Sequence, residues 1–254
     1  MASIAHDETP VQHRGGPPLY GRMMKAIQSG HTFGNRIRML KLPLIFLEES
    51  LYAGAIAQFY WLTATLEAEM DKQKHEPMVA AVITGLDLGR VTSGYESDLQ
   101  QLYGIGWRDR VDKVRTAATT AYMHELSQAN PASLAAAAFI LYGALVVGGG
   151  KMTQAKVRKV IPRCQHMLFD VADDMRSARQ KFKNTFTAIG KDFPEDFATL
   201  EQEAARFMSL NNSVIISIRC WGIRATAIGA VSFAVIGGLT ACSYAALSRR
   251  LLRS

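Results

Sequence analysis

Residues 225–247, ATAIGAVSFAVIGGLTACSYAAL, form a run of 23 residues without a charged side chain. A helix of that length is about 34 Å long, which exceeds the roughly 30 Å hydrocarbon core of a bilayer. The pattern therefore predicts one C-terminal transmembrane helix. A buried core helix is the alternative, but core helices are usually shorter and carry a polar stripe. Arginines at both ends would fix the depth of the span in a membrane: Arg219, Arg224, Arg249, Arg250 and Arg253.

The rest of the chain divides around this run. We expect residues 1–18 to be a flexible leader, 19–218 a helical domain, and 219–254 the anchor with a short basic tail. The leader has no apolar core, which argues against a secretory signal, and it is too acidic for a typical mitochondrial transit peptide. A span so near the C-terminus predicts a tail anchor. Its Gly, Ala and Ser content favours a mitochondrial membrane, with the endoplasmic reticulum second.

The charge and the cysteines narrow the choice of partners. The net charge of +7 comes from dispersed Lys and Arg without a nucleic-acid-binding motif, so no nucleic acid partner is expected. Membrane lipid, an anionic cofactor or an acidic protein suits that charge better. Cys164, Cys220 and Cys242 are far apart and show no CxxC or Cys/His spacing. Neither a disulfide framework nor a zinc site is expected.

The first predicted helix carries a histidine within an apolar stripe. Spacings of three and four residues join Tyr20, Met23, Met24, Ile27 and His31. The stripe places His31 on the inward face of the helix. Gly30 and Gly34 flank the histidine and allow close backbone approach, and we expect the helix to end near them.

Helical periodicity continues through the rest of the domain. No segment of any length alternates with period two, so the predicted fold class is all-α. Helices are predicted over 44–70, 88–103, 114–128, 132–159, 167–189 and 194–218, the last continuing into the anchor.

Three consecutive glycines, Gly148, Gly149 and Gly150, interrupt the segment ASLAAAAFILYGALVVGGGKMTQAKVRK at residues 132–159. Glycine inside a helix costs about 1 kcal/mol relative to alanine. A chain that keeps three of them needs bare backbone close to something flat or bulky, or else a kink. A simple break between two shorter helices is the alternative.

The order of these features resembles the haem oxygenase family from Tyr20 to Ile218. MKAIQSGHTFGNRIRML is similar to the family's proximal helix, AQFYWLTATLEAEMDKQKHEP to its second long helix, and LYGIGWRDRV to its Tyr-Gly-x-x-Trp turn. AFILYGALVVGGGK corresponds to the distal helix, and RQKFKNTFTAIGKDFPEDFATLEQEAARFMSLNNSVIISI to the C-terminal pair. Five matches in the right order, followed by the tail anchor seen in some members, imply the family's helical bundle.

The resemblance also implies haem held between the proximal and distal helices, with His31 as the iron ligand. Bare backbone at Gly148 and Gly149 would lie against the ring. Arg179 and Lys183 match the family's basic pair for the haem carboxylates, and their spacing of four residues sets both on one helical face. Lys25 would contribute a further cation. A solvated helix face is the alternative for such charges.

The distal segment departs from the family. Active members carry Gly-Asp-Leu-Ser-Gly-Gly, whose Asp orders a water on the distal side of the haem. A gap-free alignment places Val146 at the Asp position and Leu145 at that of the first glycine. A shifted gap places Gly143 and Ala144 there, again without a carboxylate. Because a positioned proton donor contributes about 10²–10⁴-fold to a rate, its loss should cripple turnover. The distal positions in the gap-free alignment are Val146, Gly149 and Gly150.

Two classes of function remain open. In the first, the chain is a non-catalytic accessory subunit with protein partners in a membrane complex, as the missing Asp favours. In the second, it is an active haem oxygenase that cleaves haem to biliverdin, iron and CO with electrons from a reductase, as the retained His31 and glycines favour. A haem-binding carrier or sensor lies between them. We favour the first, because catalysis is set by the site and the fold does not guarantee it. The remaining histidines, including His166, are read as polar residues without function.

Overall fold

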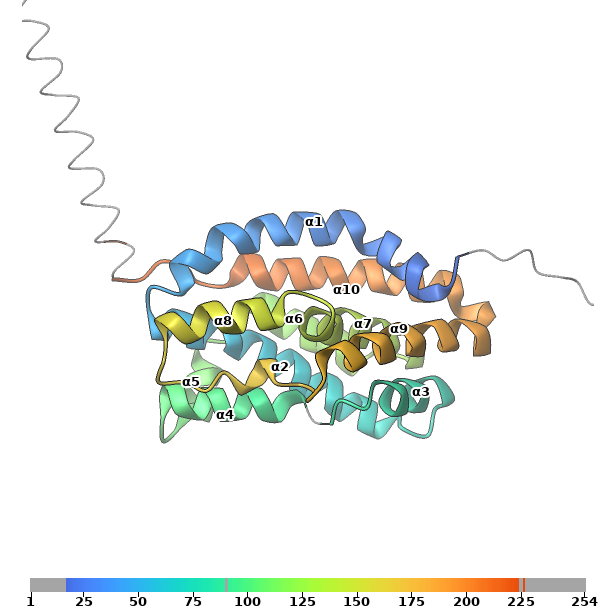
Figure 1. Ribbon diagram of the computed structural model, residues 1–254, viewed down its shortest axis with the longest axis horizontal. Helices are drawn as coiled ribbons and strands as arrows, with labels where there is room; N and C mark the ends of the chain where they lie inside the picture. Colours follow the sequence, from blue (N-terminus) through green and yellow to red (C-terminus); the bar gives the residue numbers. More distant parts are fainter. Residues whose placement is uncertain (1–16, 90, 224–225, 227–254) are drawn as a thin grey trace, which may run out of the picture.

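The described part of the chain, residues 17–89, 91–223 and 226 of the computed structural model, contains helices and no strand. The all-α prediction is therefore confirmed. Two short 3₁₀-helices, η1 (Met167–Phe169) and η2 (Pro194–Asp196), precede the last two long helices. The α-helices of Figure 1 are α1 (Leu19–Ile45), α2 (Glu49–Lys72), α3 (Pro77–Leu86), α4 (Val91–Tyr103), α5 (Trp107–Lys113), α6 (Ala117–Ser127), α7 (Pro131–Val146), α8 (Gly150–Val160), α9 (Met175–Asp192) and α10 (Phe197–Ser217).

An alanine-rich helix, α7, lies in the middle of the bundle (Figure 1). Asn130 caps it by accepting a hydrogen bond from the Ser133 N–H at 2.8 Å, and Pro131 suits the first helical position. Residues 132–142 are all buried. Because alanine side chains are small, the neighbouring helices α2, α3, α9 and α10 pack closely around this core helix.

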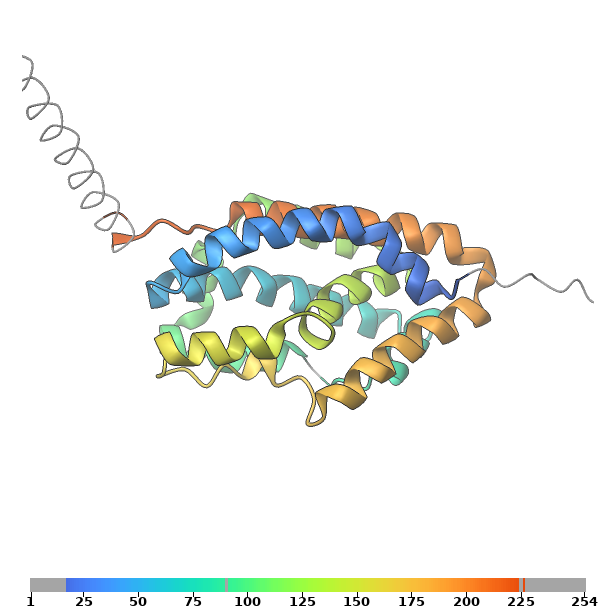
Figure 2. The same cartoon turned by 45° about the horizontal axis from the view of Figure 1, so that its top comes forward.

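Helix α1 lies on α10, and the two run parallel along one side of the molecule (Figures 1 and 2). Two glycines make the close contact: a Cβ on Gly30 would lie 2.8 Å from Met208 Cγ, and one on Gly34 would lie 2.0 Å from Asn212 Oδ1. Asn212 Nδ2 donates to the Gly30 carbonyl at 2.9 Å. The predicted close backbone approach is therefore confirmed, with α10 as the neighbour.

Several predicted helix ends are wrong. Helix α1 does not end near Gly34 but continues through Pro43, because packing on α10 supports it to its end. The predicted ranges leave out α3, which Pro77 begins at the first helical position. Helix α10 does not continue toward residue 225: it ends at Ser217, and Ile218 is extended with φ −60° and ψ 126°.

The predicted anchor lies almost wholly outside the described residues, which include only Thr226 of the run 225–247. Among the described helices, none is long and apolar enough on its own to cross a membrane. By length and composition, α7 and α8 qualify only as a pair, and a bend of 53° separates them. The C-terminal span stays a prediction.

We predict that Gly34→Ala lowers the free energy of unfolding by about 1–3 kcal/mol, the usual cost of overpacking a close contact. The new methyl group would displace Asn212 from the Gly30 carbonyl. The matched control is Gly54→Ala on α2, where nothing lies within 4 Å of the added Cβ. That change should stabilise by up to about 1 kcal/mol through helix propensity. Urea denaturation followed by circular dichroism measures both; equal effects would contradict the contact.

Candidate functional site

The side chain of His31 is exposed on α1 and makes no hydrogen bond or ion pair with any described residue. Tyr20 lies three turns earlier, at a helical phase only about 20° away. Its ring packs edge-on against Phe139 of α7 and Phe182 of α9, with centroids 6.0 and 6.4 Å apart. His31 therefore lies on the flank of α1 that faces α7 and α9.

The predicted apolar stripe is only partly correct. Met23 and Ile27 are buried, whereas Met24 is 38% exposed and His31 is exposed. The reason is the rotation of α1 about its axis, since Gly30 and Gly34 point most directly at α10. His31 is left at the edge of this contact, open to solvent, and its imidazole is free to bind a ligand.

A break between α7 and α8 lies across from the middle of α1, and both views place the two at the same level along the long axis (Figures 1 and 2). Its glycines are required locally. A Cβ on Gly148 would lie 2.5 Å from the Ala144 oxygen, and one on Gly150 would lie 2.8 Å from the Leu145 oxygen. A helix break thus accounts for both positions. Gly149 is less restricted, since its Cβ would meet only Met152, at 3.3 Å from Cε.

The residues in the last turn of α7 differ in whether their side chains are buried or exposed next to the break. Val146 is fully buried and Leu145 is 8% exposed, so both belong to the core. Ala144 is exposed, and Gly143 is half-buried against Phe182. The gap-free alignment, which placed Val146 on the distal surface, therefore disagrees with the burial. The shifted alignment, with Ala144 in that place, agrees with it.

The helix that carries His31 and the two helices that meet at the glycine break have no carboxylate: α1, α7 and α8 contain no Asp or Glu. Asp170 approaches α8 from the following loop but is fully engaged. Burial pushes the pKa of Asp170 upward, yet hydrogen bonds from Lys151 and Gln154 outweigh it and hold the pKa below its usual range. Together α1, α7 and α8 therefore carry cations and no acidic side chain of their own.

The three predicted cations differ in their surroundings. Arg179 Nε donates to the Val146 carbonyl at 3.0 Å, which ties α9 to the end of α7. Lys183 is exposed one turn later on the same helix and forms no ion pair with a described residue. Lys25 does not share the face of His31, because six residues on a helix correspond to a rotation of about 120°. A role for Lys25 in the site stays a prediction, and this rotation argues against it.

Arg38 is a cation that the sequence analysis missed. It lies two turns after His31 at a phase about 20° away, so both share one face of α1. Arg38 donates to Asn35 Oδ1 at 2.8 Å, while its buried Nε has no acceptor among the described residues. Burial lowers the pKa of Arg38. An unsatisfied buried donor costs about 1–3 kcal/mol, so an anionic group bound on this face would be stabilised there.

His166 is buried, contrary to its predicted polar setting. Its Nε2 lies 2.9 Å from the Ile161 carbonyl, which can only accept, so Nε2 carries the proton. Its Nδ1 then accepts from the Tyr52 hydroxyl at 2.9 Å. An imidazole with both nitrogens engaged holds the α8–α9 connection in place. Its sequence signal is the apolar Met-Leu-Phe that follows directly.

A buried carboxylate fastens the same connection to α4. Asp98 accepts hydrogen bonds from the Met167 N–H at 2.7 Å and the Leu168 N–H at 2.9 Å. Burial raises the pKa of Asp98, and the two backbone donors oppose that shift. Local sequence patterns could not predict this contact, because Asp98 lies 69 and 70 residues before its partners along the chain.

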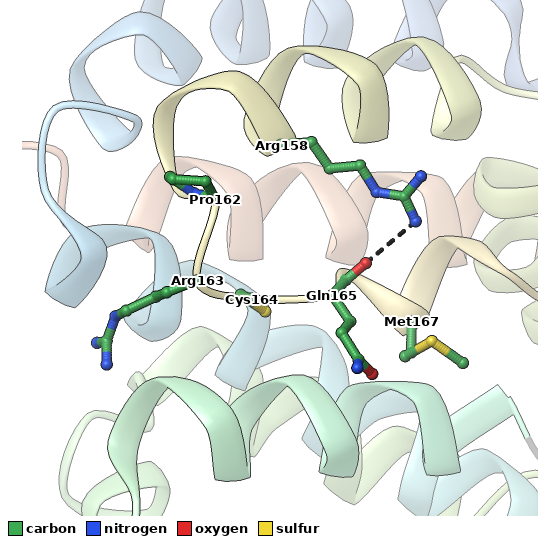
Figure 3. Close-up of a pocket in the computed structure, with 6 residues that line it drawn as sticks. All are labelled: Arg158, Pro162, Arg163, Cys164, Gln165 and Met167. Atoms are coloured by element: carbon green, nitrogen blue, oxygen red, sulfur yellow. Dashed lines mark hydrogen bonds between the residues drawn. The ribbon is translucent and has the colours of Figure 1, made fainter.

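A pocket of about 580 Å³, wide open to solvent, lies between α8, α4 and the connecting segment (Figure 3). Its polar groups are already engaged. Arg158 donates to the Gln165 carbonyl at 3.2 Å, and Arg163 binds Glu49 and the Leu102 carbonyl. Burial raises the pKa of the Cys164 thiol to about 12, so it stays protonated near neutral pH. We find no chemistry there that competes with the face of His31.

The sequence profile of the family described as "Heme oxygenase" matches residues 19–215. The chain belongs to the haem oxygenase family. It is 31% identical over 164 residues to "Heme oxygenase" of Takifugu rubripes, a match that covers 61% of this chain and 57% of that protein. It is 27% identical over 191 residues to "Heme oxygenase 1" of Synechocystis sp., covering 72% and 76%. A match to "Heme oxygenase 1" of Nostoc sp., 28% identical, covers 52% of this chain and 55% of that one.

Solved structures agree on the fold. Haem oxygenase 2 from Chlamydomonas reinhardtii, solved without haem, has a TM-score of 0.73 at 24% identity, covering 81% of this chain and all of that one. Haem oxygenase-1 from Synechocystis, solved in complex with haem, has a TM-score of 0.67 at 22% identity, covering 88% and 100%. The haem-oxygenase-like bundle predicted from the sequence is confirmed.

The α1 side and the α7–α8 side of the site differ in the groups that they offer to haem. On the α1 side, His31 offers an imidazole without a partner among the described residues, which fits an iron ligand. On the α7–α8 side, exposed Ala144 and the glycine break present small residues and supply no acid. Across α1, α7 and α8 the structure thus offers an exposed imidazole and no carboxylate.

We predict that Asp98→Asn lowers the free energy of unfolding by about 1–3 kcal/mol, because the amide leaves one buried N–H without an acceptor. Asp173→Asn, at an exposed position, is the matched control and should change stability by less than about 0.5 kcal/mol. Thermal unfolding of the two variants measures the difference. An unchanged midpoint for Asp98→Asn would show that its carboxylate does not fasten the connection.

Proposed function

We propose that this chain binds haem through His31, has lost ring-opening activity, and serves as a non-catalytic accessory subunit at a membrane. One observation carries the proposal: α1, which carries His31, and the helices α7 and α8 across from it contain no carboxylate. The binding side of the site is intact, so the loss concerns proton delivery. Family membership supports haem as the ligand.

Different side chains would bind the iron and the carboxylates of haem. The His31 imidazole would donate a nitrogen lone pair to the iron. Lys183 and the free end of the Arg179 guanidinium would attract the haem carboxylates, and Arg38 offers a donor on the His31 side. Bound haem would supply a redox-active iron centre. The α7–α8 break would let bare backbone approach the ring.

The methyl group of Ala144 explains the proposed loss of activity. Ring opening needs a proton delivered on the distal side, and a positioned acid or ordered water typically contributes about 10²–10⁴-fold. A methyl group neither holds a proton nor orders a water by hydrogen bonding. Arg179 and Lys151 are cations there, and cations disfavour the approach of a further proton.

The membrane part of the proposal rests on the uncharged run 225–247. Gly229, Gly237 and Gly238 within it would permit close packing on a partner helix, as expected of a subunit in a membrane complex. The basic tail and the moderate hydropathy favour a mitochondrial membrane over the endoplasmic reticulum.

An active haem oxygenase is the second candidate function. The observations in its favour are the family match over residues 19–215 and the accessible His31 imidazole. It would cleave haem to biliverdin, iron and CO with electrons from a reductase. A haem carrier or sensor shares the binding step of the first proposal and differs only in what becomes of the haem.

Haem binding is tested by titration of the purified protein with haem, followed in the Soret band. His31→Ala should abolish the shift seen for the parent protein, because the iron loses its protein ligand. His124→Ala removes an exposed imidazole from α6 and should leave the shift unchanged. No shift in the parent, or an equal loss in both variants, would refute His31 as the ligand.

Catalysis is tested by supplying a reductase and NADPH to the haem-loaded protein. We predict no biliverdin from the parent chain. Ala144→Asp places a carboxylate on the exposed last turn of α7 and should raise ring opening by about 10²-fold or more. Val146→Asp buries an unpaired charge, so it should destabilise the fold by about 3–5 kcal/mol without restoring activity. Steady biliverdin formation by the parent, with iron and CO released, would overturn the proposal.

A further inference from the structure

We infer that the outer flank of α1, together with the segment after α10, forms a surface that lies on an anionic lipid bilayer. We call it the lipid-facing flank. It consists of Phe33, Arg36, Leu40, Ile216, Trp221 and Ile223. The inference rests on the proposed membrane anchoring and adds how the helical domain is oriented on the membrane.

All the charged side chains of α1 are basic. Its 27 residues include five Lys or Arg and no Asp or Glu. Arg22 pairs with Glu201, and Lys41 donates to backbone carbonyls at the end of α10. Lys25 and Arg36 are exposed and form no ion pair with a described residue. Uncompensated cations on an exposed helix attract an anionic surface.

Exposed apolar side chains accompany these cations. On α1, Phe33 is 51% exposed and Leu40 is 76% exposed. They are seven residues apart, two turns of helix, and so share one face. Large apolar side chains this exposed are otherwise unfavourable in water, and basic residues beside apolar ones are typical of helices at membrane interfaces.

The end of α10 extends the same surface. Lys41 Nζ donates to the Ile218 carbonyl at 2.7 Å, so the last turns of α1 and α10 lie side by side. Near this junction Ile216 is 50%, Trp221 61% and Ile223 85% exposed. Figure 1 shows the segment after α10 leaving the bundle at the end where α1 finishes. The apolar residues of both helices therefore gather at the exit of the chain.

The distance along the chain favours lipid as the occupant. Ile223 precedes the uncharged run 225–247 by two residues, and each residue spans at most about 3.6 Å. If that run crosses a bilayer, Trp221 and Ile223 lie at its interface, where tryptophan is favoured. Leu40, near the adjacent end of α1, would then also lie at the bilayer interface.

The opposite flank of α1 stays accessible in this orientation. On the helix, Phe33 and Leu40 lie about 160° and 180° from His31. The lipid-facing flank can therefore rest on the bilayer while the flank with His31 remains open to a soluble ligand. One helix thus separates a membrane face from a binding face.

The test uses the full chain reconstituted in vesicles of phosphatidylcholine with or without phosphatidylserine, with brominated acyl chains as quenchers. Trp221→Phe removes the tryptophan beside the anchor, and Leu40→Trp then reports from α1. We expect the reporter to lose emission in brominated vesicles that contain phosphatidylserine. Met152→Trp in the same background, at a 71% exposed position on α8, is the control and should keep its emission.

Arg36→Glu added to the reporter chain should restore emission, because it reverses the exposed charge next to the apolar residues. No quenching at Leu40→Trp would overturn the inference, as would equal quenching with and without phosphatidylserine. Alkaline carbonate extraction separates the two proposals: a pelleted but unquenched chain keeps the anchor and refutes the orientation, whereas a released chain refutes both. If an acidic protein changed the emission of Leu40→Trp and brominated lipid did not, the flank would bind a protein, and the lipid inference would be wrong.

Discussion

The contact between Asn212 and the backbone of α1 sets the rotation of that helix. Gly30 and Gly34 have no side chains, so α10 approaches closely and the Asn212 amide donates to the Gly30 carbonyl. A helix held at these points cannot turn without losing a buried hydrogen bond. One flank of α1 then carries His31 and the other carries Phe33 and Leu40. Both proposed surfaces follow from this single packing constraint.

The second half of the site depends on the end of α7. The chain bends by 53° there, and carbonyl oxygens of the last turn leave no room for side chains at Gly148 and Gly150. Arg179 donates to the Val146 carbonyl and holds α9 against the bend. Because Val146 points into the core, the exposed position of this turn belongs to Ala144. The helices α1, α7 and α8 carry cations and no acidic side chain, which is the basis of the proposed loss of ring opening.

The all-helical fold and the family could be predicted from the sequence, because helical periodicity and five short motifs can be read without knowledge of tertiary contacts. Features that depend on tertiary contacts could not. The proline at Pro77 signals either the end of one helix or the start of the next, and only packing decides. The polar residues next to His166 in the sequence suggested an exposed side chain. Its imidazole is buried instead, because it forms a hydrogen bond with the hydroxyl of Tyr52, 114 residues away in the sequence.

The candidate site shows the same limit. The stripe placed His31 on the inward face of α1, but it could not distinguish a buried position from the exposed edge position that His31 occupies. Lys25 was included by its closeness in sequence, although helical phase turns it away. The burial of Val146 corrected an alignment that residue types alone left ambiguous.

A crystal structure of the haem complex tests the central claim most directly. The account predicts a nitrogen of His31 bonded to the iron and the exposed last turn of α7 on the other side, with Ala144 facing the ring. No carboxylate oxygen should lie within hydrogen-bonding reach of the distal side. An Asp or Glu that holds a water there, or a ligand other than His31 on the iron, would contradict it.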